Sequence, residues 1–419
     1  MNHDLIKTVI FDQHEIIKNV NLIKRNYSFE YALNYVLVGL RRAGKTMLLY
    51  SIVKDLINNG IDWNQIIYVN FEDERLIEFT MEDFNDIVLV KNELGDKKGY
   101  YFFDEIQNVN GWEKFVRRLA DQKEFVYITG SNAKMLSKDI STALGGRFIS
   151  RYVSTFSFEE FLDGKEILHE ESDLLTTSSR GKIIRMFDEY FTYGGFPETL
   201  NIKSKREYVS NVYQKIILSD VMSRNSIRNE KAMKLIVKKI AESVRNEISY
   251  SKLHNIVRNI GSTISKDALI DYIGYLKDAY LLFDIKNYFA SFLEKESNPK
   301  YYFSDNGLLN LFLIDKKSSL LENLVGIYLY NKYDNELYYL KSSKTGVDID
   351  FYVPQDSLVV QVAYSIQGEA RQREIENLVK YAKLSNQDKL VIVTHDEEES
   401  IIYDEFEIQV IPAYKFVLR

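Results

Sequence analysis

Residues 39–46 read Gly-Leu-Arg-Arg-Ala-Gly-Lys-Thr, a stretch of the form GxxxxGK[ST]. The apolar residues 35–38 precede it, and residues 47–53 have a composition that is compatible with a helix. In a strand–loop–helix unit of this kind, backbone N–H groups of the loop and the positive end of the helix dipole surround phosphate oxygens. The stretch therefore predicts an α/β fold with a parallel sheet and a binding site for a nucleoside triphosphate.

Two residues of the loop have direct roles in this prediction. Lys45 is expected to reach the β- and γ-phosphates, and the Thr46 hydroxyl is expected to bind Mg²⁺. The residues expected to contact the nucleotide are Gly39, Arg41, Arg42, Ala43, Gly44, Lys45, Thr46 and Met47. A nucleoside triphosphate and Mg²⁺ are therefore the predicted ligands.

Residues 100–105 read Tyr-Tyr-Phe-Phe-Asp-Glu, which is the Walker B pattern. The four aromatic residues predict a central strand that is buried on both faces and ends at the nucleotide crevice. Asp104 is expected to hold Mg²⁺ through water, and Glu105 to polarise the attacking water as a general base. Taken alone, the two carboxylates also fit an ordinary strand end.

Six sequence blocks, two of which contain the motifs described above, resemble the corresponding blocks of one AAA-type P-loop ATPase family of bacteria and archaea. Members of this family carry an uncharacterised C-terminal domain. The blocks are GLRRAGKT (39–46), FFDEIQNVNGWEKFVRRL (102–119), ITGSN (128–132), LGGR (144–147), STFSFEEFL (154–162) and FTYGGFPE (191–198). The resemblance covers nearly the whole chain. It implies an ASCE-type sheet with an extra strand between the loop strand and the strand that ends at Asp104. It also implies ATP as the nucleotide and ATP hydrolysis by Asp104 and Glu105.

Two further positions are candidates for contact with the γ-phosphate. Residues 125–129 predict a strand, and related ATPases place a sensor at the tip of this strand, where Ser131 and Asn132 lie here. Either residue can instead cap the following helix. Arg147 follows two glycines and can act as an arginine finger, in its own chain or from a neighbouring subunit, or form an ion pair in a surface turn.

The composition limits the class of protein. At 419 residues the chain is too long for one ordinary core, and we expect domains at 1–160, 161–300 and 301–419. The absence of cysteine excludes disulfides, cysteine-bound zinc and thiol catalysis. The start of the chain has no signal pattern and no window is apolar enough to span a membrane, so a cytoplasmic protein without a membrane partner is expected.

The middle of the chain predicts mainly helices. Residues 193–198 predict a fixed turn, and three helices up to residue 276, with Ser251 and Ser265 as N-caps, are followed by a predicted hairpin. This order is typical of a winged helix-turn-helix. Residues 201–260 hold 13 Lys and Arg against 5 Asp and Glu, a local charge of +8 that leaves −15 for the rest of the chain. The segment 201–260 is therefore a candidate DNA-binding surface, and a solvated helical face is the alternative.

Within 201–260, the residues that favour a DNA partner are Arg224, Arg228, Lys231, Lys234, Lys238 and Lys239. The third predicted helix offers only Lys266 and Lys277. A winged helix that packs against protein therefore fits as well as one that binds DNA.

The C-terminal residues resemble the PD-(D/E)xK nuclease core. Glu322 lies in a predicted helix and Asp350 in a predicted strand, and they match the metal-binding carboxylates of that core. The last motif reads Gln361-x-Ala363 in place of (Asp/Glu)-x-Lys, which removes an acidic ligand and a lysine. We therefore expect an inactive, small α/β restriction-endonuclease-like domain, unless Arg371 or Arg373 replaces the lysine. Asp350, with Asp348, can also be an ordinary strand-edge carboxylate.

The sequence as a whole predicts a Mg²⁺-dependent ATPase of AAA type that acts as a conformational switch. DNA, a partner protein or a second copy of the chain are the candidate partners. Two alternatives stay open. One is an ATP-dependent nuclease or DNA-processing enzyme, which needs an active C-terminal domain. The other is a nucleotide-gated DNA-binding regulator without significant turnover.

Overall fold

The computed structural model describes residues 3–130, 142, 144–314, 317–385 and 389–418. The chain divides into two compact units. The first contains Met1–Ser154 together with Asp278–Tyr280, and the second contains Thr155–Lys277 and Leu281–Arg419. Each unit has its own β-sheet, and the two are described separately below.

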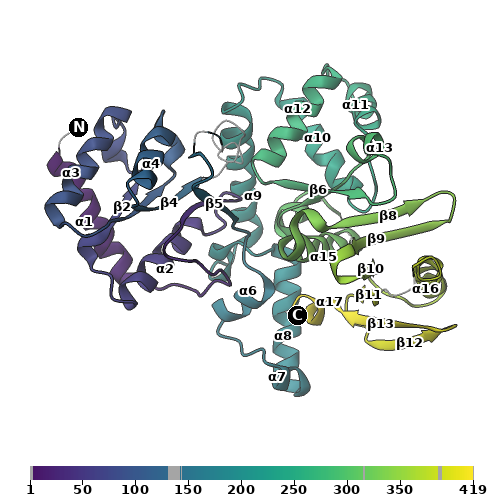
Figure 1. Cartoon of the computed structure of the whole chain (residues 1–419). Coiled ribbons are helices and arrows are strands. Elements are labelled where there is room, and N and C mark those ends of the chain that lie inside the picture. Colours follow the sequence, from purple (N-terminus) through teal and green to yellow (C-terminus); the bar gives the residue numbers. More distant parts are fainter. Residues whose placement is uncertain (1–2, 131–141, 143, 315–316, 386–388, 419) are drawn as a thin grey trace. The chain divides into compact units, whose positions relative to one another are not determined.

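The first unit is built on a five-stranded parallel sheet with the order β2-β3-β4-β1-β5 (Figure 1). Its strands are β1 (Asn34–Val38), β2 (Ile66–Asn70), β3 (Tyr100–Asp104), β4 (Phe125–Gly130) and β5 (Phe148–Tyr152). Strand β4 lies between the strand before the glycine-rich loop and the strand that ends at Asp104. The predicted parallel sheet and its extra strand are therefore confirmed.

Helices cover both faces of this sheet because its strands are apolar on both sides. The helices are α1 (His3–Asn19), α2 (Lys45–Asn58), α3 (Phe84–Leu94) and α4 (Trp112–Asp121), with short 3₁₀ turns at Trp63–Gln65, Glu74–Leu76, Met81–Asp83 and Ile106–Asn108. Helices α1, α3 and α4 pack on one face, where Phe84, Phe103 and Phe115 meet. Helix α2 packs on the other face against tyrosine side chains of β1, β2 and β4. The unit is a three-layer α/β structure.

The second unit begins with a run of helices. They are α6 (Phe158–Gly164), α7 (Glu171–Leu175), α8 (Thr177–Tyr193), α9 (Lys205–Lys215), a π-helix (Ile216–Ser223), α10 (Glu230–Ser243), α11 (Tyr250–Asn259) and α12 (Lys266–Asp278), with a 3₁₀ turn at Pro197–Leu200. The N-cap of α11 is Ser249, whose side chain accepts from the Lys252 N–H, so the predicted cap Ser251 is wrong by two residues. Ser265 caps α12 as predicted, by accepting from the Ala268 N–H.

The second sheet has eight strands in the order β12-β13-β11-β10-β9-β8-β6-β7. Its strands are β6 (Leu282–Asn287), β7 (Lys300–Phe303), β8 (Tyr338–Ser342), β9 (Val347–Val353), β10 (Leu358–Val362), β11 (Lys389–Thr394), β12 (Glu399–Tyr403) and β13 (Phe406–Pro412). The predicted hairpin exists as the antiparallel pair β6 and β7. It is not a free wing, because β6 also pairs with β8 and so joins the hairpin to the large sheet.

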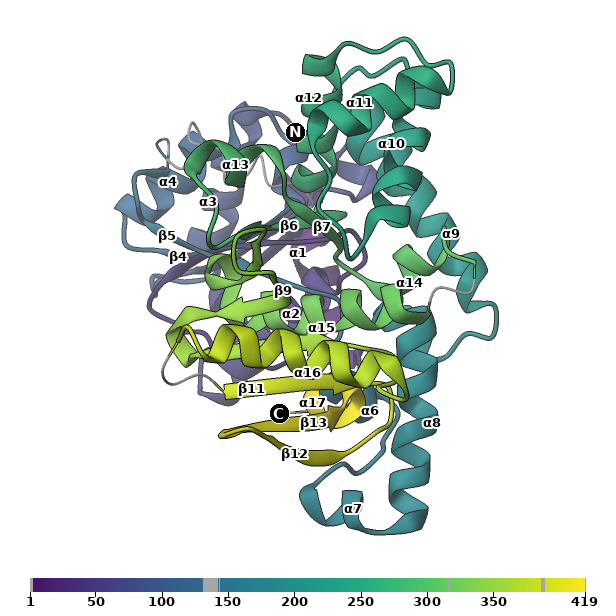
Figure 2. The ribbon, with the colours of Figure 1, turned by 90° about the vertical axis from the view of Figure 1, so that its right-hand side faces the viewer.

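The remaining helices pack around this sheet. They are α13 (Phe292–Ser297), α14 (Asn306–Asn310), α15 (Lys317–Tyr333), α16 (Glu369–Ala382) and α17 (Ala413–Phe416), with 3₁₀ turns at Asp334–Glu336 and Pro354–Asp356. Figure 2 shows α16 lying beside β11 on one face of the sheet, and Ile375, Leu378 and Val379 of α16 are buried in the core against that sheet. Residues 161–300 and 301–419 thus share one compact unit, and their division into two domains stays a prediction.

The predicted turn at residues 193–198 is held by a buried carboxylate. Asp305 accepts hydrogen bonds from the Gly195 N–H at 2.8 Å and from the Thr155 hydroxyl at 2.9 Å. Gly194 has a positive φ of 76°, and a Cβ at this position would lie 1.9 Å from an Asp305 oxygen. Only glycine fits here, which gives the turn a structural role.

None of the helices in the described part of the chain combines the length and the apolar character needed to span a membrane.

Candidate functional site

The glycine-rich loop connects β1 to α2 at the carboxyl end of the parallel sheet. Gly39 has a φ of 150°, and a Cβ there would lie 2.2 Å from the carbonyl oxygen of Val153. Gly44 is the N-cap of α2 in the left-handed conformation, and no side chain caps this helix end. The first N–H groups of α2 therefore face the loop without a capping side chain, as anion binding at a helix N-terminus requires.

Lys45 is buried inside the curve of the loop. Its Nζ donates to the carbonyl oxygens of Gly39 and Leu40, each at 3.0 Å. Arg42 has a positive φ of 64°, which places the loop backbone in a conformation that non-glycine residues rarely adopt. These contacts fix the backbone conformation of the loop around the Lys45 ammonium.

A buried arginine from outside the motif supports the loop. The two terminal nitrogens of Arg25 donate to the carbonyl oxygens of Ala43, at 3.0 Å, and Ser154, at 2.8 Å. One guanidinium thus ties the loop to the end of β5. A single arginine before the first strand belongs to no motif, so sequence reasoning missed it.

Asp104 lies at the carboxyl end of β3 and is 1% exposed. Its Oδ2 accepts from the Tyr68 hydroxyl at 3.1 Å, and its Oδ1 accepts from the Thr129 hydroxyl. The Thr46 hydroxyl also lies near this carboxylate and favours its charged form. Burial raises the pKa of Asp104, and the charge of Glu105 raises it further, while the three hydroxyls act in the opposite direction. The structure thus brings together Thr46 and Asp104, the two predicted metal ligands.

Glu105 is half-buried and has a left-handed backbone with a φ of 51°. Its N–H donates to the Thr129 hydroxyl at 2.9 Å, so Thr129 connects the Asp104 carboxylate to the backbone of Glu105. The side-chain amide of Gln107 donates to the Glu105 carboxylate. These contacts orient Glu105 beside Asp104 at the same edge of the sheet.

Thr129 and Tyr68 are functional candidates that the motif reading missed. Thr129 is the first polar residue after the apolar part of β4, and this change of polarity was the available signal. The predicted sensor residues Ser131 and Asn132 lie outside the described residues, so their role stays a prediction. The hydroxyl of Tyr68 comes from β2, and its contact depends on the pairing of β2 with β3.

Two predicted nucleotide contacts at the loop lie toward its outer side. The Arg41 guanidinium lies 3.4 Å from an Glu72 carboxylate oxygen, in the acidic turn after β2. Met47, in the first turn of α2, is 46% exposed. Arg41 belongs to the loop and Met47 directly follows it, and their contact with the nucleotide stays a prediction.

Arg147 lies at the opposite end of the sheet from the loop. Its Nε contacts an Asp121 oxygen at 2.5 Å, and Phe148, the next residue, pairs with Asn34 at the start of β1. The loop begins after the end of β1, and a five-residue parallel strand is roughly 16 Å long. The prediction of an arginine finger acting in its own chain is therefore wrong, because the strand register places Arg147 too far away. A role from a neighbouring subunit stays a prediction.

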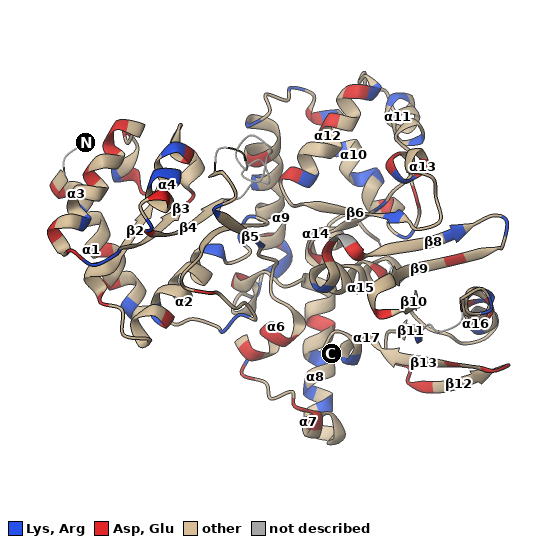
Figure 3. Cartoon of the chain, in the orientation of Figure 1, with Lys and Arg blue, Asp and Glu red and all other residues tan. Residues whose placement is uncertain are grey.

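Several cations of the basic segment 201–260 have partners within the segment or beside it (Figure 3). Lys234 pairs with Glu230 at 2.5 Å, Lys239 pairs with Glu242 at 3.3 Å, and Lys231 donates to the Gly261 carbonyl oxygen. A groove of about 960 Å³ lies along α9, and its charged residues are Lys203, Lys205, Arg206, Glu207, Glu230 and Lys234. The groove keeps an excess of positive charge.

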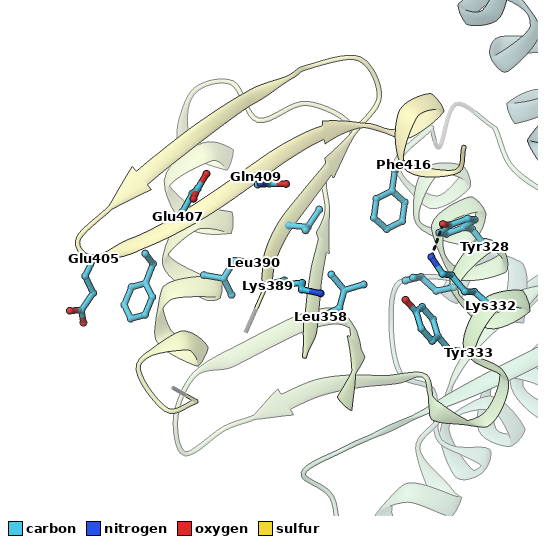
Figure 4. A pocket seen from close by; sticks show the side chains of 13 residues that line it. Tyr328, Lys332, Tyr333, Leu358, Lys389, Leu390, Glu405, Glu407, Gln409 and Phe416 are labelled. Carbon is cyan, nitrogen blue, oxygen red and sulfur yellow. Dashed lines mark hydrogen bonds between the residues drawn. The ribbon is translucent and has the colours of Figure 1, made fainter. Parts of the chain in front are cut away.

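A second cavity, of about 570 Å³, lies beside the large sheet (Figure 4). Tyr328 and Lys332 enter it from α15, Lys389 from the start of β11 and Phe416 from α17. The lining also includes two glutamates, Glu405 and Glu407, so that its formal charges cancel. The cavity therefore favours neither an anionic nor a cationic ligand.

The nuclease-like residues also come together in the second unit. Glu322 on α15 and Asp350 on β9 are both buried, and the Asp350 N–H donates to Gln361 on β10 at 3.4 Å. The ammonium of Lys300, which the sequence did not single out, lies 3.6 Å from Glu322 and 3.2 Å from Asp350. Asp348, two residues before Asp350, is exposed.

The two arginines expected near this cluster differ. Arg373 lies beside it and bonds to Glu374 at 2.5 Å, whereas Arg371 forms an ion pair with Glu399 on β12. Ala363 follows β10 and carries no functional group. In the described residues, no group of three or more His, Asp or Glu side chains is placed to hold a metal ion.

Comparison with known families finds two matching domain models. One, described as an AAA domain, matches residues 33–162, and one described as a domain of unknown function, DUF8612, matches residues 184–319. Among solved structures, the chain is similar to the Walker-type ATPase PABY2304 of Pyrococcus abyssi, with a TM-score of 0.44 and 15% identity over 71% of this chain and 100% of that chain. It is also similar to the ORC1 protein of Aeropyrum pernix in complex with DNA, with a TM-score of 0.29 and 15% identity over 70% of this chain and 88% of that one.

Two curated relatives align along most of the chain. An uncharacterised protein of Haemophilus influenzae is 29% identical over 388 residues, which cover 89% of this chain and 92% of that protein. An uncharacterised protein of Methanocaldococcus jannaschii is 33% identical over 431 residues, which cover 99% of this chain and 95% of that protein. The chain therefore belongs to the family of AAA-domain proteins that includes this Methanocaldococcus jannaschii protein.

Proposed function

We propose that the chain is a Mg²⁺-dependent ATPase in which the bound nucleotide sets the conformation of the rest of the chain. One observation carries this proposal. Two oxygen ligands from different elements, the Thr46 hydroxyl and the Asp104 carboxylate, lie close enough at the end of the glycine-rich loop for the hydroxyl to lower the pKa of the carboxylate. Oxygen ligands of this kind suit Mg²⁺, which usually takes one or two protein ligands together with phosphate oxygens.

The site fits a nucleotide as well as a metal ion. The uncapped N–H groups of α2 and the ammonium of Lys45 supply positive partners for phosphate oxygens. When bound, Mg²⁺ stabilises charge on the transferred phosphoryl group. Asp104 and Thr46 hold the metal position, and Lys45 holds the phosphates. Glu105, oriented by Thr129 and Gln107, accepts the proton of the attacking water.

Phosphate release from ATP tests the assignment. We expect Glu105→Gln to lower the hydrolysis rate about 10²- to 10⁴-fold, the usual contribution of a general base, while ATP binding is retained. Glu113→Gln, on the first turn of α4, is the matched control and should hydrolyse ATP at the rate of the unchanged chain. Lys45→Ala supplies the blank. Hydrolysis that persists in Glu105→Gln contradicts the role of this residue.

A conformational switch makes a separate prediction. Addition of ATP should change the pattern of proteolytic cleavage in residues 155–419 of the unchanged chain and leave that of Lys45→Ala unchanged. Identical patterns with and without ATP would exclude the switch while leaving hydrolysis intact.

DNA is the second candidate partner, and the basic groove along α9 favours it. The test is the same hydrolysis assay with and without duplex and single-stranded DNA, repeated with Lys203→Glu and Lys234→Glu combined. Stimulation by DNA that the double variant loses supports DNA as the partner. Hydrolysis that is indifferent to DNA favours a protein partner or a second copy of the chain.

A further inference from the structure

We infer that the ammonium group of Lys300 serves as a built-in counter-cation for the buried carboxylate pair Glu322 and Asp350, in the place where a divalent metal ion would otherwise bind. In the nuclease-like part of the chain, a lysine side chain therefore neutralises the buried carboxylates, and no metal ion binds there. The inference concerns a site of the second unit and does not depend on the proposed ATPase activity.

The lysine lies between the two carboxylates and away from solvent. Its side chain is 4% exposed, that of Glu322 is 0% exposed and that of Asp350 is 13% exposed. The three residues come from β7, α15 and β9, which are separated in sequence, so the fold itself assembles the group. An ammonium at 3.2 Å and 3.6 Å from two carboxylates supplies the positive charge that a buried anionic pair requires.

The remaining oxygen atoms of the pair are also hydrogen-bonded. Glu322 accepts from the Tyr302 hydroxyl at 2.9 Å and from Arg245 Nε at 3.1 Å. The second oxygen of Asp350 accepts from the Val362 N–H at 3.0 Å. These three protein groups and the lysine together give each of the four carboxylate oxygens a protein donor.

A third carboxylate joins the cluster through a neutral amide. Gln361 Nε2 donates to Glu374 at 2.6 Å, and the other oxygen of Glu374 pairs with Arg373. The cluster thus contains three carboxylates (Glu322, Asp350 and Glu374) and three cations (Arg245, Lys300 and Arg373). The formal charges of these six side chains cancel, and the exposed Asp348 is a further carboxylate that acts on Lys300. A metal site needs a larger excess of negative charge.

A divalent ion and Lys300 exclude each other in this space. A metal ion would need carboxylate oxygens at about 2.0–2.6 Å and would lie beside a buried ammonium of the same sign. The neutral side chain of Gln361 agrees with charge compensation by Lys300, because an acidic residue at that position would add one uncompensated negative charge to the cluster. The side-chain set is consistent with a domain that has no metal-activated water and so cannot cleave DNA by that route.

Manganese binding tests the inference. Bound Mn²⁺ is counted by electron paramagnetic resonance in full-length chains without nucleotide, all carrying Asp104→Asn so that the nucleotide site adds no metal. The chain with Lys300 should bind no Mn²⁺ at the cluster. Lys300→Met should gain one bound Mn²⁺ per chain, because removal of the ammonium leaves two buried carboxylates uncompensated.

Two controls separate this result from general changes in charge. Lys341→Met removes a lysine from the half-exposed pair with Glu247 and should add no Mn²⁺ site. Lys300→Met combined with Glu322→Gln removes one cation and one anion, and it should lose the Mn²⁺ site that Lys300→Met gains.

Folding of the variants is followed by circular dichroism. A Lys300→Met chain that folds only with Mn²⁺ supports the inference, and a folded Lys300→Met chain that binds no Mn²⁺ overturns it. If Lys300→Met does not fold, Mn²⁺ binding to the chain that keeps Lys300 still tests the inference. Mn²⁺ bound to that chain and lost in Asp350→Asn overturns the inference, and its absence supports it.

Discussion

Two sites in this molecule bury carboxylates beside strand ends, and they differ in the groups that face those carboxylates. Asp104 accepts from the hydroxyls of Thr129 and Tyr68 and lies near that of Thr46, and the strongest neighbouring charge is another carboxylate. Glu322 and Asp350 instead face the ammonium of Lys300. The first site is oriented by neutral donors and the second by a cation.

The difference decides which site can take a cation from solution. A hydroxyl donor fixes the position of a carboxylate oxygen without cancelling its charge, so the charge stays available to a metal ion. A buried ammonium cancels that charge and has already compensated for the desolvation of the pair. A buried carboxylate alone is therefore a weak sign of a metal site, and the identity of its donors is the stronger one.

The largest expected effect separates the two sites by activity. We expect Asp104→Asn to lower the ATP hydrolysis rate about 100-fold or more, because a bound metal ion contributes several kcal/mol of transition-state stabilisation. Glu322→Gln removes a carboxylate from the second site. It should leave the basal ATP hydrolysis rate within about twofold, because Glu322 contacts only protein groups of that site and takes no part in the reaction. Phosphate release at saturating Mg²⁺ measures both. A comparable loss of activity in both variants would break the comparison.

A smaller effect concerns stability. Loss of one partner from a buried ion pair costs about 3–5 kcal/mol, and we expect this loss of unfolding free energy for Lys300→Met in metal-free buffer. Lys341→Met breaks a half-exposed pair and should cost at most about 1 kcal/mol. Urea unfolding, monitored by circular dichroism, compares the two. Equal losses would mean that Lys300 is an ordinary ion-pair partner.

The parts of the molecule that could be predicted from sequence depend on contiguous residues. The loop at 39–46, the strand that ends at Asp104 and the extra strand β4 each form one block, and the family resemblance adds their order. The sequence cannot decide between Ser249 and Ser251 as the cap of α11, because a Ser-Tyr-Ser stretch offers two caps of equal chemistry, and the structure uses Ser249.

The parts that could not be predicted depend on which elements become neighbours. Tyr68 reaches Asp104 only because β2 pairs with β3, and Arg25 reaches Ala43 across 18 positions of sequence. Lys300 is the first residue of a short strand, and nothing in the local pattern relates it to Glu322 or to Asp350. Arg147 shows the reverse case. Its motif suggested a role at the nucleotide, and the register of β5 with β1 placed it at the other end of the sheet.

The smallest expected effect tests the hydroxyl donors of the nucleotide site through pH. Burial holds the pKa of Asp104 above its ordinary value, and the Tyr68 hydroxyl opposes that rise. Metal binding needs the ionised carboxylate, so hydrolysis should fall as the pH drops through the pKa of the folded state. Tyr68→Phe removes one donor to the charged form and should raise this pKa. A hydrogen bond to a charged group contributes about 1.5–3 kcal/mol, so the acid limb of the pH–rate profile should move up by about one to two units.

Tyr127→Phe is the matched control for this measurement. Tyr127 is a buried tyrosine of β4 whose hydroxyl donates to the Tyr31 carbonyl oxygen and not to a carboxylate. Its loss should leave the acid limb in place, even if it lowers stability. A shift of the acid limb in Tyr68→Phe alone would show that neutral donors adjust the pKa of Asp104 and leave its negative charge available. In the second site, Lys300 cancels that negative charge. An unshifted limb in both variants would mean that Thr129 and Thr46 suffice to orient Asp104, and that the two sites differ by the lysine alone.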